Sequence, residues 1–452
     1  MRITLGEITL QSLPQRLVAF WRTDHRARLI MYVALLVAAF LPINLIMHLI
    51  WGISILKPLQ LWLFENHLIT DDSWRPMLAA LDWVRTGPDG TLYQEIFFQR
   101  NIKFQYPPTS LLPLAGIEAL GLQATPFLLN VINRVLLLAS AAGIGALGWI
   151  LLKRQNTGDP LIPASAAIVF GGVTFFYFPM TYGYQLGQVQ VWGNALFIFA
   201  CLAWVLNRKV AAGVLVGLIC LMKPQLALFV VWAVLRREWK FLAGGAATGA
   251  IALTLSVALF GFKNHLAYVE ALQFMSRHGE AHLSNHSFNS FLHRITGNDD
   301  GLTWSNAAFS PFNPIVYAGS LIATVATLVA GLWLRGGSEG EKSLLQFLLA
   351  ALTFTIASPI AWEPHYGVLA PALVAVFCAL LATPRSPARS KWLIGLAVIF
   401  VVSANHFPVV ALFAHTPLIL LQSYILIAGI GMMWMLWRLT DAKRPSPESA
   451  GA

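Results

Sequence analysis

The chain has 452 residues, of which 57% are hydrophobic and 11% are charged, and its formal net charge is +10. Soluble domains carry about 25% charged residues, and long apolar runs recur here from Arg28 to Arg438, so the sequence excludes a soluble protein and predicts an all-α, polytopic membrane protein. The basic residues cluster at the ends of the apolar runs, where topology and anionic lipids explain them better than nucleic acid does.

The N-terminal region sets the predicted orientation. Residues 1–28 are rich in arginine, so the positive-inside rule predicts a cytoplasmic N-terminus. Residues 29–51 form the first predicted span, which is too long for the apolar region of a signal peptide and lacks a small-residue cleavage site. Segment 53–66 is short, amphipathic and rich in Leu, which predicts a helix lying along the membrane interface.

Two apolar runs are broken by proline. Several prolines interrupt the run 106–127, which favours a re-entrant or broken element over a clean span. The run 210–235 has basic residues at both ends and Lys223-Pro224 at its centre. Two short helices that meet at Lys223-Pro224 would keep both basic ends inside, and irregular backbone at membrane depth is tolerated where it lines a protein cavity.

The predicted organisation has a membrane domain over 29–437, with about 10 full spans plus the broken helices. Two long outer loops interrupt it, at 52–105 and 263–311. The region 438–452 is predicted to be a cytoplasmic tail, and its Pro/Ser/Ala-rich end is typical of disorder.

This topology brings polar residues from five places to one level on the outer side. They are Asp71 and Asp72; Gln185, Gln188 and Gln190; Lys223; Asn285, His286, Ser287 and Arg294; and Glu363 with His365. Ionisable groups at membrane depth are costly and mark functional sites. A carboxylate can take the proton of a hydroxyl, and cationic side chains can hold a phosphate as it leaves. The set therefore favours transfer of a sugar from a lipid phosphate to an alcohol.

The order of short motifs adds a second line of argument. Asp72 is followed by Ala79-Ala80, Leu92-Tyr93, Phe104 to Pro108, Gly187-Gln188, Lys223-Pro224, Asn285 with Ser287 and Arg294, and Ser358-Pro359 with Trp362, His365 and Tyr366. In this order, over about residues 70 to 370, the chain resembles glycosyltransferase family 87. These are membrane enzymes of the GT-C type, whose best-known branch makes mannosylated phosphatidylinositol lipids in mycobacteria from polyprenyl-phosphate mannose.

The resemblance implies a GT-C-like fold, a polyprenyl-phosphate sugar as donor, a lipid or glycan hydroxyl as acceptor, and a place in the bacterial inner membrane. Three departures leave the sugar and the acceptor open. Gln190 stands where the family usually has Asn, His286 where it often has Gln, and Glu363-Pro364 where an acid and a His are commoner.

Each candidate residue also has a plainer interpretation. Asp72 could only cap the helix that begins near Ser73, although its spacing to Ala79 favours it over Asp71 as the catalytic acid. Lys223 could extend to an interface. His365 could be a core histidine, Gln188 a partner of free backbone groups, Tyr106 a shaping residue and Arg294 an exposed loop arginine.

The sequence thus predicts an inverting membrane glycosyltransferase with Asp72, or else Asp71, as general base. Its predicted substrate-binding residues are Lys223, His365, Gln188, Tyr106, Asn285 and Arg294. No group of metal ligands with convincing spacing is present in the sequence, so we expect a reaction that needs neither metal nor cofactor. A flippase or transporter of lipid-linked sugars and a sugar-polymer ligase or polymerase are the alternatives.

Overall fold

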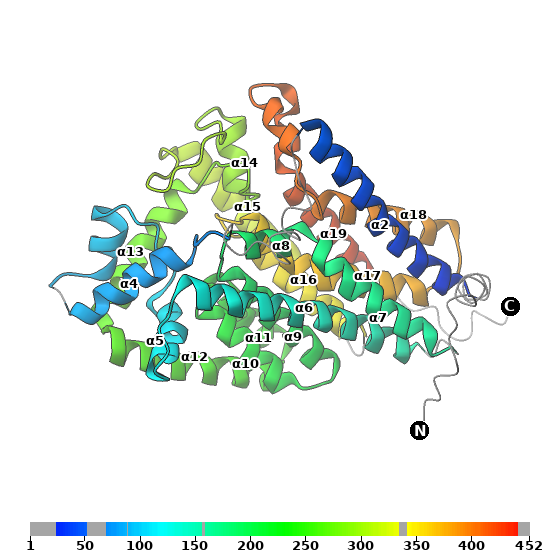
Figure 1. Ribbon diagram of the computed structural model, residues 1–452, viewed down its shortest axis with the longest axis horizontal. Coiled ribbons are helices and arrows are strands. Elements are labelled where there is room, and N and C mark those ends of the chain that lie inside the picture. The colour runs from blue at the N-terminus through cyan, green and yellow to red at the C-terminus, as the bar shows by residue number, and fades with distance from the viewer. Residues whose placement is uncertain (1–23, 52–68, 88, 156–158, 334–340, 442–452) are drawn as a thin grey trace.

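A computed structural model describes residues 24–51, 69–87, 89–155, 159–333 and 341–441 (Figure 1). Within these residues every regular element is a helix, and the one extended pairing is an isolated antiparallel bridge between Asn285 and Trp362. The predicted interfacial segment 53–66 and the end of the predicted tail lie outside the described residues.

Five helical segments of the described chain are long and apolar enough to cross a membrane. They are α6 (Pro126–Arg154), α12 (Trp239–Phe260), α15 (Pro314–Leu332), η6 with α17 (Glu363–Ala382), and η8 with α19 (Pro417–Asp441). A sixth is possible if α7 and η4 (Leu161–Phe176) form one span with α8 (Phe178–Gln185) across a bend of 49°. The prediction of an all-α membrane protein is therefore confirmed, whereas about 10 full spans remains a prediction.

Eight further helices complete the main body of the described residues. They are α2 (His25–Trp51), which covers the predicted first span, α9 (Gln190–Val205), α10 (Lys209–Cys220), η5 (Pro224–Leu228), α11 (Phe229–Arg236), α16 (Glu341–Ile356), α18 (Pro387–Ser403) and η7 (Pro408–Phe413). Their apolar side chains form one continuous core with α6, α7, α17 and α19. Figure 1 shows α2 and α18 on the right of the molecule and α9, α10 and α11 in its lower part.

Several helices begin with a polar cap followed by proline. The Thr125 side chain accepts a hydrogen bond from the Leu128 backbone N–H at 3.2 Å, and Pro126 occupies the first helical position of α6. Asn313-Pro314 and Ser386-Pro387 begin α15 and α18 in the same way. A cap satisfies a free N–H, and proline there lacks only a donor that would have had no partner.

The two proline-broken runs are broken in the structure as well. Between α10 and η5, Lys223 has extended rather than helical backbone angles (φ −132°, ψ 80°). The run 106–127 forms only the short helices η3 (Pro108–Leu111) and α5 (Leu112–Ala119) before α6 begins at Pro126. Proline lacks an N–H and clashes with the preceding turn, which explains both interruptions.

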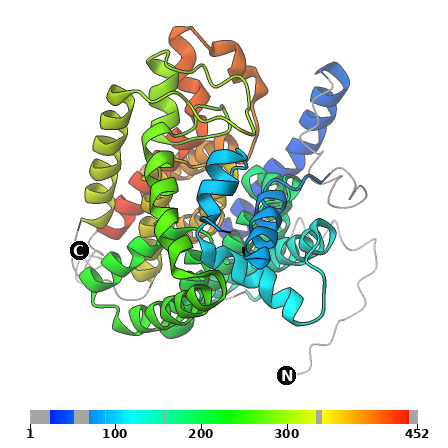
Figure 2. The same cartoon turned by 90° about the vertical axis from the view of Figure 1, so that its left-hand side faces the viewer.

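The described parts of the two predicted outer loops contain helices. The first contains α4 (Trp74–Thr86) and the π-helix η2 (Tyr93–Gln99), and the second contains most of α13 (Phe262–His278) and all of α14 (Phe288–Ile295). The α4–η2 region and α13 share a second apolar core, in which the Tyr93 and Tyr268 rings lie 5.3 Å apart. Figure 2, turned so that this end faces the viewer, shows the blue α4–η2 region beside the green α13.

Small residues allow α10 and α12 to cross closely. A Cβ on Gly213 of α10 would overlap the Phe241 carbonyl of α12, and a Cβ on Gly244 would overlap the Val210 carbonyl of α10. A Cβ on Gly249, one turn further along α12, would meet nothing within 4 Å. Close backbone contact through small residues is how helices associate where water provides little driving force.

This crossing yields a test of the fold. Gly213→Ala should destabilise the protein by about 2 kcal/mol, because the added methyl must push the two helices apart. Gly249→Ala is the matched control, which should be neutral or slightly stabilising because alanine favours helix. Thermal unfolding midpoints of both variants in nanodiscs measure the difference, and equal midpoints would contradict the observed crossing.

Candidate functional site

The site is built on a short contact between the first outer segment and the turn from α8 to α9. The backbone N–H groups of residues 70, 72 and 73 donate to the carbonyls of residues 185, 186 and 187 at 3.0, 3.0 and 3.3 Å. Gly187 has a φ of +62°, and a Cβ there would overlap the Thr70 carbonyl. Glycine alone meets both demands without strain. The contact therefore fixes the backbone of Asp72 against α8 and α9.

The Asp72 carboxylate is held by an amide. Its Oδ2 accepts a hydrogen bond from Gln188 Nε2 at 2.7 Å, and the Gln188 backbone carbonyl accepts one from Asn133 Nδ2 at 3.2 Å. Asp72 remains exposed, yet the surrounding protein desolvates its carboxyl group and raises the pKa of Asp72, while the Gln188 hydrogen bond and the Lys223 charge oppose that rise. A carboxylate with a raised pKa is a stronger base.

The capping interpretation of Asp72 does not fit this geometry. The residue before α4 is Ser73, whose side chain caps no backbone N–H and instead makes a hydrogen bond of 2.7 Å with the Tyr106 hydroxyl. The side chain of Asp72 is engaged by Gln188, and Asp71 contributes a backbone carbonyl that accepts from the Arg75 N–H at 2.8 Å. Of the two acids, Asp72 is the one whose carboxylate the protein positions.

A lysine and a histidine form the second half of the site. Lys223 Nζ lies 2.7 Å from His365 Nε2, and it lies 5.4 Å from the centre of the Tyr106 ring. His365 comes from η6 and is 7% exposed, whereas Lys223 comes from the break before η5 and is half-buried. An ammonium donates to an imidazole nitrogen that carries no proton. Lys223 can thus remain charged with two further donors free, and it points to His365 rather than extending away.

Tyr106 lies between the two halves. Its hydroxyl contacts Ser73, next to Asp72, while its ring lies beneath Lys223, and its carbonyl accepts a hydrogen bond of 2.5 Å from the Tyr93 hydroxyl. Five of the predicted residues are therefore brought together, namely Asp72, Gln188, Tyr106, Lys223 and His365. They come from five separate parts of the chain.

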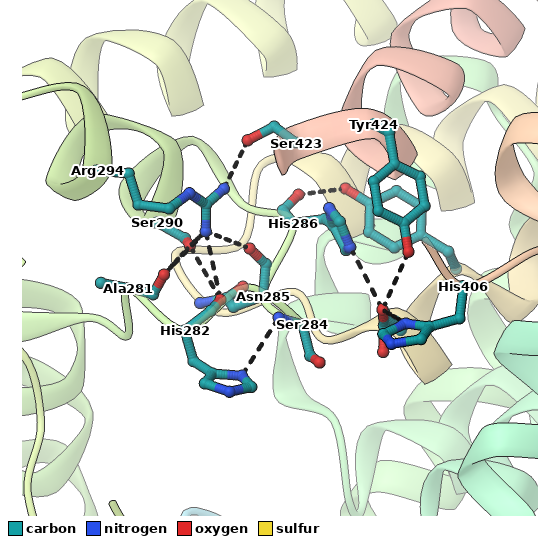
Figure 3. A network of polar contacts seen from close by, with 12 residues as sticks. Ala281, His282, Ser284, Asn285, His286, Ser290, Arg294, His406, Ser423 and Tyr424 are labelled. Carbon is teal, nitrogen blue, oxygen red and sulfur yellow. Dashed lines mark hydrogen bonds and ion pairs between the residues drawn. The ribbon is translucent and has the colours of Figure 1, made fainter. Parts of the chain in front are cut away.

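Arg294 and Asn285 belong to a neighbouring network (Figure 3). Arg294 is 3% exposed, so its interpretation as an exposed loop arginine is wrong. Its Nη1 donates to the Ala281 carbonyl at 2.8 Å and its Nη2 to Ser423 Oγ at 2.6 Å. Asn285 donates to the Glu280 carbonyl at 2.7 Å and accepts from the Ala361 N–H at 2.8 Å. Both side chains hold protein backbone in place.

That backbone leads directly to His365. The His286 N–H donates to the Ala361 carbonyl at 2.8 Å, and the Glu363 N–H donates to the Ser284 carbonyl at 2.9 Å. The loop before α14 and the segment before η6 are thereby joined. Arg294 and Asn285 consequently hold the backbone that leads to His365, and the substrate contact predicted for them stays a prediction.

A buried acid beside His365 was assigned no role from the sequence. Glu363 is 1% exposed, and its Oε1 lies 3.2 Å from His406 Nδ1, 3.3 Å from the Tyr424 hydroxyl and 3.7 Å from His286 Nε2 (Figure 3). His406 and Tyr424 are more than 40 residues away in sequence, as the separations of 43 and 61 show. No local sequence motif predicts a pairing over such a separation.

A second charged pair was missed altogether. Lys103 Nζ lies 2.5 Å from Glu280 Oε1, with side chains only 10% and 6% exposed, and 4.4 Å from the ring centres of both Trp304 and Phe309. Burial raises the pKa of Glu280 to about 7, against the opposing charge of Lys103. Lys103 is also close enough to Asp72 to lower the pKa of that carboxyl. The sequence signal that could have pointed to this pair is Lys103 itself, a lysine three residues before Tyr106.

Among the residues that the structure describes, no group of three or more His, Cys, Asp or Glu side chains could hold a metal ion. The metal-independent reaction stays a prediction.

Experiment can separate a structural role of Arg294 from a role in substrate binding. Arg294→Met should lower stability by about 3 kcal/mol, because buried carbonyls and hydroxyls lose a charged donor. Arg277→Met, at an exposed arginine of α13, should leave the unfolding midpoint unchanged. An unchanged midpoint for Arg294→Met, with donor binding weakened, would restore the substrate-binding role.

The comparisons with known proteins identify the family of the chain. The model of glycosyltransferase family 87 matches residues 104–384, a range that includes Tyr106, Gln188, Lys223 and His365 and begins after Asp72. No solved structure matches significantly.

Two curated relatives come from mycobacteria. The polyprenol-phosphate-mannose-dependent alpha-(1-2)-phosphatidylinositol mannoside mannosyltransferase of Mycobacterium tuberculosis is 25% identical over 287 residues, which is 61% of this chain and 62% of that protein. The corresponding pentamannoside mannosyltransferase of Mycolicibacterium smegmatis is 26% identical over 312 residues, 68% of this chain and 69% of that protein. The match thus spans less than two thirds of the first relative. Because the family model matches more than half of the chain, the protein belongs to glycosyltransferase family 87.

Proposed function

We propose that the protein is an inverting glycosyltransferase that moves a hexose, in the first instance mannose, from a polyprenyl-phosphate sugar to a hydroxyl group of a lipid or glycan. The observation that carries this proposal is the Asp72 carboxylate, held by Gln188 and linked through Ser73 and Tyr106 to the Lys223–His365 pair. Family membership and the names of the relatives support the donor.

Asp72 is the proposed general base. The acceptor oxygen attacks the anomeric carbon while its proton passes to the Asp72 carboxylate, and the bond from that carbon to the phosphate oxygen breaks. A displacement in a single step inverts the anomeric centre. The Gln188 hydrogen bond fixes the direction of the carboxylate and leaves Oδ1 for the acceptor. Positioned proton transfer of this kind contributes about 10²- to 10⁴-fold in rate.

Lys223 and His365 are the proposed binding groups for the leaving phosphate. A phosphate that loses its sugar gains negative charge, and donors fixed in advance stabilise that charge most strongly in a water-poor site. Because Lys223 is already oriented by His365 at 2.7 Å, little side-chain entropy is lost on binding. His365 in turn depends on the backbone that Asn285 and Arg294 hold.

The site is proposed to face the outer side of the bacterial inner membrane. Trp74, two residues after Asp72, donates to Asn130 Oδ1 at 2.7 Å, close to the start of α6, whereas Lys153 and Arg154 end the same helix. A helix of 29 residues is about 43 Å long, enough to cross a bilayer. By the positive-inside rule its basic end is cytoplasmic, which puts Asp72 outside.

The same rule supports the rest of the topology. α19 ends with Arg438 in its last turn, which favours a cytoplasmic C-terminus. We propose cytoplasmic regions over 1–28 and 438–452 on either side of a membrane domain over 29–437, whose two outer segments are 52–105 and 263–311.

Removing the base tests the chemistry. Asp72→Asn should lower sugar transfer by about 10²- to 10⁴-fold, because the amide cannot take a proton but keeps the shape of the side chain. Asp71→Asn is the matched control and should retain transfer within a few-fold. Purified protein in liposomes would be given labelled polyprenyl-phosphate mannose and lipid extract from the source cells. Normal transfer by Asp72→Asn would remove Asp72 from the role, and uptake of labelled lipid-sugar without covalent product would favour a transporter.

Removing the cation tests the donor site. Lys223→Met should raise the donor KM roughly 10- to 100-fold, because a hydrogen bond to a charged phosphate is lost. Lys209→Met is the matched control, since Lys209 begins α10 and lies over the Trp204 ring, at the other end of that helix. A donor KM for Lys223→Met equal to that of the control would show that the phosphate is held elsewhere.

A further inference from the structure

We propose that Trp304, Trp362 and His282 form a platform that binds a sugar ring of the acceptor; this inference rests on the transferase function proposed above. The three side chains come from three separate segments. The ring centres of Trp304 and Trp362 lie 5.0 Å apart, and His282 lies 5.6 Å from the first and 6.0 Å from the second.

Two independent connections place the platform beside the reacting groups. Lys103 lies over the Trp304 ring at 4.4 Å, and its charge also acts on the Asp72 carboxyl. Trp362 immediately precedes η6, and its carbonyl accepts the His365 N–H at 2.8 Å. One connection leads to the proposed base and the other to the proposed phosphate site. An acceptor bound on the platform would therefore lie near the proposed base and near the segment that carries the proposed phosphate-binding histidine.

The platform combines accessible rings with a fixed foundation. Trp304 is 42% exposed, and Trp362 and His282 are partly exposed. The Lys103–Glu280 ion pair, whose ammonium group contacts the Trp304 ring, is almost completely buried. The Trp304 indole N–H donates to Asn306 Oδ1 at 2.8 Å, and the His282 carbonyl accepts from Arg294 at 3.3 Å. Ligand-binding sites combine aromatic walls with a few fixed polar groups in this way.

The chemistry of the rings suits a pyranose. One face of a pyranose carries mainly C–H groups, which pack on an indole, while its hydroxyl groups project from the rim. Aromatic rings contribute about 0.5–1.5 kcal/mol beyond the area that they bury when they pair with each other, and an indole presents the same face to a sugar. An interfacial anchor is the other common role of Trp in membrane proteins. Trp362 directly precedes the spanning segment Glu363–Ala382, but Trp304 and His282 lie on loop segments away from the ends of the spanning helices, which favours the sugar for the platform as a whole.

Binding can be tested without catalysis. Full-length protein in nanodiscs would be mixed with the methyl glycosides of mannose, glucose and galactose, and saturation transfer to the sugar ring protons would be measured by NMR. Wild type should transfer saturation to at least one of them. Trp304→Ala should abolish this transfer, and Trp304→Phe should restore part of it. Phe312→Ala, at a 50% exposed aromatic of the same loop, is the matched control and should behave as wild type.

Kinetics supply a second readout. In the transfer assay Trp304→Ala should raise the acceptor KM about tenfold and leave the donor KM unchanged. No saturation transfer from wild type to any of the sugars, or equal transfer from wild type and from Trp304→Ala, would overturn the platform. Sugar binding that depends on Trp304, without any transfer by wild type, would keep the platform and refute the proposed transferase.

Discussion

The structure depends on a backbone contact that only one residue type permits. Residues 70–73 pair with the turn at 185–187, and Gly187 makes that approach possible because it has no Cβ and a positive φ. Buried backbone groups without partners are costly, so the pairing has to be complete. Once it forms, Asp72 and Gln188 are placed within hydrogen-bonding distance, and Ser73 is placed to meet Tyr106. The proposed base is thus positioned by main-chain geometry rather than by a charge.

On the other side of the site, a second set of contacts also fixes the backbone. Asn285 satisfies one carbonyl and one N–H on two separate segments, and Arg294 satisfies the carbonyls of the turn between them. Buried polar networks are stable only when nearly every member is paired. The polar residues of this region are therefore divided between two tasks. One group of side chains lies at the proposed reaction site. The other group forms hydrogen bonds with loop backbone that would otherwise lack partners.

This division explains what the sequence could and could not reveal. Apolar runs and the Lys223-Pro224 break were readable because composition and proline act locally. The meeting of Asp72, Gln188, Lys223 and His365 followed from motif order and membrane topology together. The burial of Arg294 was not readable, since it depends on contacts with residues as distant as Ser423. The Lys103–Glu280 pair joins residues 177 positions apart, which no periodicity records.

The departures from the family pattern make sense as a connected set. His286, which stands where the family often has Gln, lies 3.7 Å from Glu363, so the buried acid is faced by the imidazole of that departure. An unpaired buried carboxylate would be very costly, whereas one shared between two histidines and a tyrosine is not. Gln190 donates to Asn194 Oδ1 at 3.0 Å, and Asn194 donates to the Pro364 carbonyl at 3.1 Å. All three departures therefore converge on the segment that carries His365. They alter how the proposed phosphate-binding histidine is supported. Asp72, Lys223 and the accessible rings of Trp304 and Trp362, which we propose to take part in transfer and acceptor binding, lie outside these changes.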